Sequence, residues 1–238
     1  AKFTGVLLPW FGERHVLGVL LGRPITAAQL LAIASIVVLT GLNWRGLRTG
    51  RLVQDVFTLT KTAALFGLIV LGVLVGRDPA AAAANAAGFW KASWTHLEAG
   101  RITGVEPLSG AMLLAAIGVA MVGSLFSSVA WENVTFIAGE AKRPQRDIPL
   151  SLALGTGIVT LLYCLANVAY VLLLPLGGHP DGTTVAARGI QFATSDRVGV
   201  AAATMMFGTP GAVLMAVLIM ISTFGCNNGQ ILSGARVY

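Results

Sequence analysis

Polar side chains interrupt an apolar stretch of the chain near residue 130. The run "LSGAMLLAAIGVAMVGSLF" is followed by Ser127 and Ser128, and then by Trp131 and Glu132. Serine competes with helical hydrogen bonds, and a backbone inside a membrane leaves helical geometry only where protein or a watery cavity surrounds it. Such a break exposes carbonyl and N–H groups that can bind the charged ends of a small molecule. The alternative is an intact helix whose small residues pack against neighbouring helices.

Lys61 is a charged side chain inside the apolar run "VQDVFTLTKTAALFGLIVLG". It lies about 12 Å from the start of the run if the helix rises roughly 1.5 Å per residue. The helix face that carries it is otherwise polar and includes Gln54, Thr58 and Thr62. An ionisable group at this depth is costly, which favours a functional role such as carrying a proton or replacing a cation. The alternative is a structural lysine that extends its ammonium to the membrane surface.

A third polar group lies in "ISTFGCNNGQ", residues 221–230, near the end of the sequence. Ser222, Thr223 and Asn227 lie in one half of the expected helix, next to Asn228. The two glycines of this stretch are four residues apart, a spacing that allows a second helix to approach closely. These polar residues either line a site or supply hydrogen bonds between helices.

Other kinds of chemistry have no counterpart in the sequence. It contains no metal-ligand spacing, nucleophile–base pair or phosphate-binding loop, so no catalytic residue, metal or cofactor is predicted and an enzyme is not expected. Cys164 and Cys226 both lie in apolar runs, which does not indicate a disulfide framework. The expected outer loop at residues 10–25 lacks a cysteine that could link to a partner subunit.

The composition indicates the elements that must position these groups. Of the 238 residues, 55% are hydrophobic and 11% are charged, whereas soluble domains carry about 25% charged residues. An all-α polytopic membrane protein is therefore predicted over residues 1–238, without a separate soluble domain. The expected spans are residues 25–42, 53–76, 108–138 (discontinuous), 149–176 and 211–232, preceded by a helical stub at 2–11.

The distribution of charge in the loops predicts an orientation. Residues 43–51 contain three arginines and no acid, and residues 140–149 carry three further bases. The alternate loops, 77–106 and 179–209, hold equal numbers of acids and bases. Basic loops stay on the cytoplasmic side of a membrane, so loops 43–51 and 140–149 are expected there. The net charge of +6 is thus explained without a nucleic-acid partner.

Three stretches together resemble a known family. The segments "VQDVFTLTKTAALF", "LFSSVAWENVTFIAGEAKRPQRDIPLSL" and "ISTFGCNNGQILSGARVY" are similar to those of amino acid–polyamine–organocation transporters, and most similar to the L-type amino acid transporter branch. The resemblance implies a leucine-transporter-type fold of twelve helices with an inverted repeat of five plus five. This chain would run from the end of helix 3 to helix 8, so helices 1, 2 and 9 to 12 would be missing.

The resemblance also implies a substrate site. Phe126 matches the aromatic residue that covers the bound substrate in the family. The backbone of residues 126–129, which includes Ser127, Ser128 and Val129, matches the unwound stretch whose carbonyls receive the substrate's amino group. Trp131 matches the aromatic residue that follows the break.

Two departures from the family pattern lie next to these matches. Family members often carry glycines where this sequence has Val129 and Ala130, and Glu132 replaces a residue that is more commonly neutral. The departures affect the unwinding of the helix and the size of the pocket. Glu132 and Asn227 are therefore further candidate site residues.

Lys61 matches the family's helix 5 lysine, whose ammonium occupies the position of sodium in sodium-coupled relatives. Ser222 and Thr223 match the helix 8 region near that position. The resemblance therefore implies sodium-independent transport, by exchange or by proton coupling.

The leading hypothesis is a secondary amino acid transporter of the cell (inner) membrane that works by alternating access. Its partners would be an amino acid, the lipid bilayer and the missing helices, and this piece alone is not expected to transport. One alternative is a polyamine or organocation permease of the same superfamily, and another is a membrane interaction subunit without transport activity. A channel would need charge rings or a carbonyl filter, which the sequence lacks.

Overall fold

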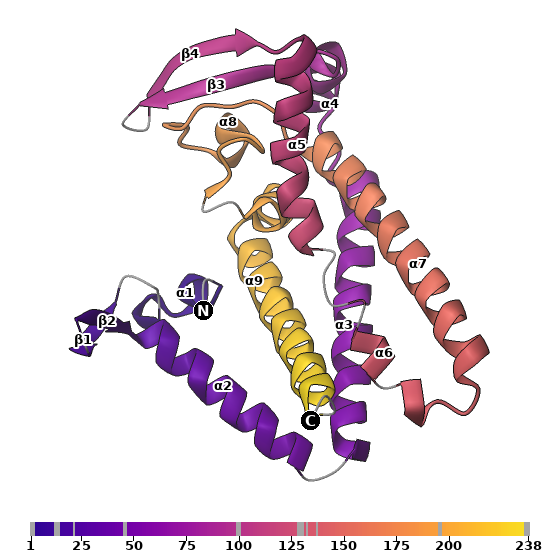
Figure 1. Cartoon of the computed structure of the whole chain (residues 1–238). Coiled ribbons are helices and arrows are strands. Elements are labelled where there is room, and N and C mark those ends of the chain that lie inside the picture. Colours follow the sequence, from indigo (N-terminus) through magenta and orange to yellow (C-terminus); the bar gives the residue numbers. More distant parts are fainter. Residues whose placement is uncertain are drawn as a thin grey trace. The chain divides into compact units, whose positions relative to one another are not determined.

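The structure is a computed structural model that describes residues 3–11, 15–20, 22–44, 47–98, 101–127, 131, 133–136, 138–194 and 197–235. Helices make up most of it (Figure 1). The longer helices are α2 (Ala27–Trp44), α3 (Leu47–Leu74), α5 (Gly110–Ser127), α7 (Pro144–Leu173) and α9 (Val198–Gly234). The short helical segments are α1 (Thr4–Leu7), η1 (Pro9–Phe11), α4 (Pro79–Gly88), α6 (Asn133–Phe136), η2 (Ala138–Glu140) and α8 (Val185–Arg188).

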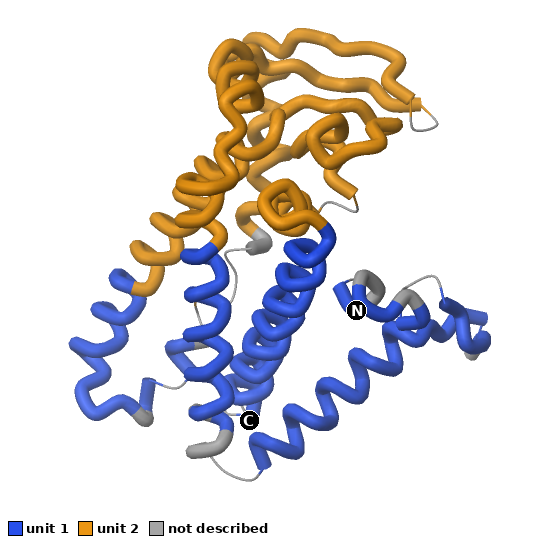
Figure 2. Tube along the Cα trace, turned by 180° about the vertical axis from the view of Figure 1, so that it is seen from behind, with its two compact units in different colours: residues 1–67, 133–154, 209–238 blue, residues 68–132, 155–208 orange. Residues whose placement is uncertain are grey.

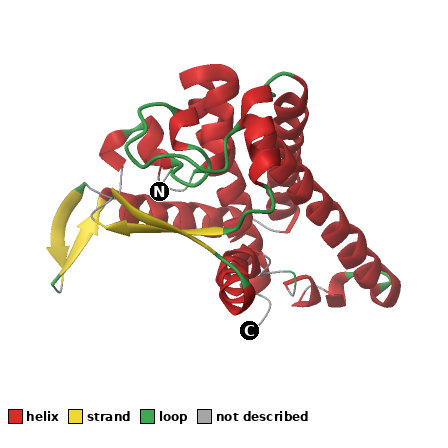
Figure 3. Ribbon diagram, turned by 90° about the horizontal axis from the view of Figure 1, so that it is seen from above, coloured by secondary structure: helices red, strands yellow, loops and turns green. Residues whose placement is uncertain are grey.

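Two antiparallel hairpins interrupt the helical pattern (Figure 3). One pairs β1 (Val16–Leu20) with β2 (Arg23–Thr26), and the other pairs β3 (Ser93–Glu98) with β4 (Arg101–Pro107). Every strand among the described residues belongs to one of these hairpins. The expectation of an all-α chain is therefore wrong in this respect, although the chain is mostly helical. Strands of four to seven residues are too short for a pattern of alternation that could be distinguished from irregular structure.

The chain divides into two compact units (Figure 2). Unit 1 comprises Ala1–Gly67, Asn133–Leu154 and Thr209–Tyr238, and unit 2 comprises Leu68–Glu132 and Gly155–Gly208. The long helices α3, α7 and α9 each contribute residues to both units.

Four helices in the described part of the chain are long and apolar enough to cross a membrane. They are α2, residues 52–74 of α3, α7 and α9, and α5 is a shorter apolar helix. The expected spans at 25–42 and 53–76 overlap α2 and α3, and those at 149–176 and 211–232 overlap α7 and α9. Many large apolar side chains on these helices are exposed, as a lipid-facing surface requires.

Three helices begin earlier than the sequence indicates. α3 starts at Leu47 instead of residue 53. α7 starts at Pro144 and contains Pro149 in its second turn, where only one backbone hydrogen bond is lost near an end that already has unpaired N–H groups. α9 starts at Val198 and continues through a kink at Gly208, which has φ 65° and ψ −150° and lies two residues before Pro210. Apolar, alanine-rich residues before the kink thus extend a helix that was expected to begin at residue 211.

The alanine-rich segment after α3 forms the short helix α4 in unit 2. Asp78 caps it, because its Oδ1 accepts hydrogen bonds from the N–H groups of Ala80 (2.9 Å) and Ala81 (3.4 Å), and Pro79 occupies the first turn. The buried Asn85 then fastens α4 to the end of α7. Its Nδ2 donates to two carbonyl oxygens, each at 2.8 Å, and its Oδ1 accepts from a backbone N–H at 2.8 Å.

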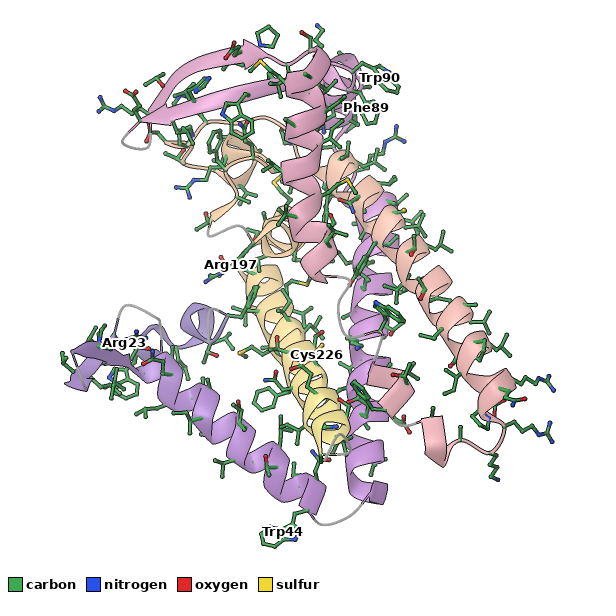
Figure 4. The ribbon with its side chains drawn as sticks, viewed as in Figure 1. Arg23, Trp44, Phe89, Trp90, Arg197 and Cys226 are labelled. Carbon is green, nitrogen blue, oxygen red and sulfur yellow. The ribbon has the colours of Figure 1, made fainter. Side chains whose placement is uncertain are left out.

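Exposed aromatic side chains mark the ends of two helices (Figure 4). Trp44, the last residue of α2, is 90% exposed, and Trp90, just after α4, is 91% exposed. Phe89 packs edge-on against Trp90 with ring centroids 5.1 Å apart. Tryptophan is enriched at membrane–water interfaces, so these positions agree with helices that end at a membrane surface.

Candidate functional site

The expected break lies between α5 and α6, at the end of the first of the two segments of unit 2, Leu68–Glu132. The backbone of Phe126 and Ser127 forms the last turn of α5, and α6 begins at Asn133. Trp131 lies in a turn between them, and its side chain is 62% exposed. Helical structure is therefore interrupted at Trp131. The other members of the expected substrate site, Ser128, Val129 and Glu132, lie outside the described residues together with Ala130.

The second group of candidate residues lies on α3 and α9 in unit 1, where these helices pack in opposite directions. Gly229 lies beside Gln54, since a Cβ at Gly229 would be 3.6 Å from the Gln54 Nε2. One turn along α3, Phe57 fills the space left by Gly225, where a Cβ would come within 2.7 Å of the Phe57 Cβ. The two glycines thus allow the close helix approach that their spacing predicts.

These contacts indicate where Lys61 and Ser222 lie. Lys61 follows Phe57 by four residues and Ser222 precedes Gly225 by three, and residues three or four apart occupy the same helix face. The helical repeat therefore puts Lys61 and Ser222 on the two facing surfaces and at the same level. Both residues are half-buried. Within the described residues, Lys61 has no hydrogen-bond or ion-pair partner.

Thr223 and Asn227 lie differently from Ser222. Each is two residues from Gly225, and two residues rotate a helix by about 200°, so neither shares the face that meets α3. The Thr223 hydroxyl is exposed and donates to the Ile219 carbonyl oxygen of its own helix at 2.9 Å. Asn227 is half-buried. Of these candidate residues on α9, the α3 contact therefore involves the Ser222 face only.

The structure also places a buried polar residue that the sequence did not single out as a site. Asn228 on α9 is completely buried. Its Nδ2 donates to the Gly50 carbonyl oxygen at 3.3 Å and to the Gln54 Oε1 at 3.2 Å. Its Oδ1 accepts from the Asn43 Nδ2 at 2.9 Å. The signal in the sequence was an amide next to a helix-packing glycine, but its partners on α2 and α3 could not be read from spacing.

Metal and thiol chemistry receive no support from the described residues. No group of three or more histidine, cysteine, aspartate or glutamate side chains among them could hold a metal ion. Cys164 and Cys226 are free thiols on different helices, α7 and α9, and both are exposed (Figure 4 labels Cys226).

Comparison with known proteins identifies the kind of chain that carries these features. Over 233 residues, it is 28% identical to the serine/threonine exchanger SteT of Bacillus subtilis, a match that covers 98% of this chain and 44% of SteT. It is 24% identical to the b(0,+)-type amino acid transporter 1 of Mus musculus, over 90% of this chain and 37% of that protein. It is 26% identical to the large neutral amino acids transporter small subunit 2 of Homo sapiens, over 90% of this chain and 35% of that protein.

No solved structure gives a significant match. The chain spans less than half the length of the curated relatives that it resembles. These relatives are transporters and not enzymes, and the apolar helices make the chain a multi-pass membrane protein. The amino acid permease family model matches residues 18–238, which include the broken segment and the α3 and α9 helices, and the chain therefore belongs to the amino acid permease family of transporters.

Proposed function

We propose that the whole protein containing this chain is a secondary transporter that carries amino acids across the cell membrane by alternating access, independently of sodium. The family and the transporters named above support amino acids as the substrate class. The observation that supports the proposal best is the packing of Gly225 against Phe57 and of Gly229 against Gln54, because helical spacing from these contacts would set Lys61 opposite Ser222, with its ammonium between two packed membrane helices.

The substrate site is proposed at the end of α5 and comprises Phe126, Ser127, Ser128, Val129 and Trp131. The C-terminal end of a helix carries unpaired carbonyl oxygens and a partial negative charge, which favour an ammonium group. A helix interrupted within a membrane presents this end to a small molecule at mid-membrane depth. The exposed Trp131 side chain is available for contact with the substrate, and Glu132 is a further candidate contact.

The coupling site is proposed around Lys61, with Ser222 opposite and Thr223 and Asn227 nearby on α9. An ammonium held there supplies the positive charge that sodium supplies in sodium-coupled relatives. The Ser222 hydroxyl can accept a hydrogen bond from the ammonium. Movement of α3 against α9 would then change the surroundings of this charge, and so link substrate binding to a change of conformation.

The protein is proposed to lie in the cell (inner) membrane with segments 43–51 and 140–149, each of which includes the start of a helix, in the cytoplasm. Their bases support this orientation, and in segment 140–149 the side chains of Lys142, Arg143 and Arg146 are exposed.

The test is uptake of radiolabelled amino acids into proteoliposomes that contain the whole protein, in sodium-free buffer. Three conditions are compared: no gradient, an inward proton gradient, and vesicles preloaded with unlabelled amino acid. Stimulation by preloading alone indicates exchange, and stimulation by the gradient indicates proton symport. Uptake that requires sodium would overturn the sodium-independent mechanism, and uptake of polyamines without amino acids would favour an organocation permease.

The role of Lys61 is tested in the same assay with Lys61→Ala. The expected result is a loss of most transport with normal membrane insertion. Lys91→Ala is the matched control, because Lys91 is an exposed lysine in the loop after α4. A Lys61→Ala protein that transports like the unaltered protein, and is merely less stable, would indicate a packing role for Lys61 and overturn its role in coupling.

A further inference from the structure

Three amide side chains join α2, α3 and α9 within unit 1, and Figure 1 shows where these three helices lie. Asn43 lies at the end of α2, Gln54 in the second turn of α3 and Asn228 near the end of α9. We call these residues the amide clamp. Asn228 is bonded to both of the others, as it accepts from Asn43 at 2.9 Å and donates to Gln54 at 3.2 Å. The Asn43 Nδ2 also donates to the Leu39 carbonyl oxygen at 2.9 Å, which holds its side chain against its own helix.

Within the contact between α3 and α9, the hydrogen bonds of the amide clamp depend most strongly on the position of one helix along the other. Elsewhere in this contact, glycines of one helix pack against side chains of the other, such as Gly225 against Phe57. Packing contacts of this kind resist separation of the two helices but lack the directionality of a hydrogen bond. Asn228 has no solvent exposure, so a slip of one turn, about 5.4 Å, would leave its amide buried without partners. Because unpaired buried amides are costly, the hydrogen bonds hold the helices in one register.

The register at Gln54 also determines the position of Lys61 along α9. Gln54 and Lys61 are seven residues apart on α3, which is two helical turns, or about 10 Å. They lie on the same face, since Phe57 lies between them at helical spacing and contacts Gly225. A helix two turns long moves as a rigid body along its axis, so a displacement of Gln54 displaces Lys61 by the same amount. The clamp therefore fixes which α9 side chain faces the lysine.

We propose that the amide clamp is a positioning device that holds α3 and α9 in the register that sets Lys61 opposite Ser222. Its importance for transport rests on the proposed function of Lys61, whereas its effect on the register does not. Gln54 and Asn228 are thus positioning residues for the coupling site.

The register is tested directly by cross-linking in the whole protein. Cys164→Ser and Cys226→Ser, together with replacement of any cysteine elsewhere in the whole protein, remove the native thiols, and Lys61→Cys with Ser222→Cys provides a pair across the two helices. In this background, Gln54→Met removes the acceptor of the Asn228 bond with little change in side-chain length. Gln54→Glu keeps an acceptor oxygen. Gln230→Met is the matched control, because Gln230 is an exposed glutamine on α9.

Disulfide formation with copper phenanthroline is expected to slow by roughly tenfold in Gln54→Met, the size of a typical coupling between sites. Gln54→Glu is expected to restore most of the rate, and Gln230→Met to leave it unchanged. Cross-linking at the same rate in Gln54→Met and in the control would overturn the proposal. If Gln54→Met does not insert into the membrane, two variants of Asn228 are compared instead. Asn228→Asp keeps the acceptor for Asn43, and Asn228→Leu removes it. Equal rates of cross-linking in these two variants would also overturn the proposal.

Transport separates failure of the clamp from failure of the proposed function. With Lys61 and Ser222 intact, Gln54→Met is expected to lower the maximal uptake rate more than the substrate affinity, and Gln54→Glu to restore it. If Gln54→Met slows cross-linking but does not change uptake, the link between the amide clamp and transport is overturned. The proposal that the clamp sets the helix register would still stand. Unchanged uptake in Lys61→Ala would overturn the proposed coupling role, while the cross-linking result would still decide whether the clamp sets the register.

Discussion

Gly225 on α9 packs directly against Phe57 on α3, although the two residues lie 168 positions apart in the sequence. A Cβ added at Gly225 would come within 2.7 Å of the Phe57 Cβ and 3.3 Å of its Cγ. Real Cβ atoms do not approach so closely, so the helix separation in this region is determined by the absence of a side chain. Only glycine at position 225 therefore allows the two helices to approach this closely.

Gly225→Ala is expected to destabilise the protein, because the added methyl group pushes α9 away from α3. Overpacking of this kind costs roughly 1–3 kcal/mol, which outweighs the gain of up to about 1 kcal/mol in helix propensity. Thermal unfolding of the whole protein in detergent checks the prediction. Gly67→Ala on α3 is the control, since a Cβ there meets nothing within 4 Å, and it should be neutral or stabilising. Equal midpoints for the two variants would contradict the contact.

Asn85→Leu is expected to destabilise unit 2 by roughly 3 kcal/mol, because it leaves two carbonyl groups and one N–H without a partner. Asn85 is only 5% exposed, so water does not replace these bonds. Asn167→Leu is the matched control, as the exposed Asn167 amide bonds only within its own helix, to Tyr163. The midpoint of thermal unfolding should fall for Asn85→Leu alone, and a similar fall in both variants would argue against the role of Asn85 in fastening α4 to α7.

Local chemistry explains which parts of the fold the sequence could predict. Apolar runs of membrane length predict α2, α3 and much of α9. Ser127 and the residues after it predict an interruption, since serine competes for backbone bonds within a few residues. The two hairpins were missed because their alternation is short, and the early start of α9 was missed because Gly208 and Pro210 read as a boundary.

In the candidate site, too, helical spacing predicts some features and leaves out those that depend on packing between helices. The polar face of α3 and the small-residue pair on α9 could be read from helical spacing. The partners of Asn228 could not, because Asn43 lies 185 positions away and follows an apolar run like any other polar residue at a helix end. Which amide meets which is decided by the packing of α2, α3 and α9, and that packing leaves no trace in the spacing along any one helix.

Gly208→Ala is expected to destabilise the kink in α9. The backbone at Gly208 has φ 65° and ψ −150°, a combination that is essentially restricted to glycine and costs other residues about 1–3 kcal/mol. Gly118→Ala on α5 is the control, since no atom lies within 4 Å of its Cβ position and its φ is ordinary. Thermal unfolding should separate the two variants. A Gly208→Ala protein as stable as the unaltered one would mean that the helix can straighten at this point without cost.

Phe126→Ala is expected to weaken amino acid binding by the whole protein, with little effect on its stability. Phe126 lies in the last turn of α5, next to the interruption at Trp131, where the proposed site receives the substrate's ammonium group. An aromatic face over a cation contributes about 0.5–2 kcal/mol, so the apparent affinity should fall by roughly twofold to thirtyfold. Saturation of uptake as a function of amino acid concentration measures this.

The control for Phe126→Ala must remove an aromatic ring far from the break in sequence. Phe89→Ala serves, because Phe89 is 62% exposed at the end of α4. Phe126→Tyr keeps an aromatic face and should retain most of the affinity, whereas Phe126→Leu keeps only the apolar bulk and should bind weakly like Phe126→Ala. If Phe126→Leu bound as tightly as Phe126→Tyr, the residue would contribute apolar contact alone, and the ammonium would have to be bound by the carbonyl groups at the end of α5.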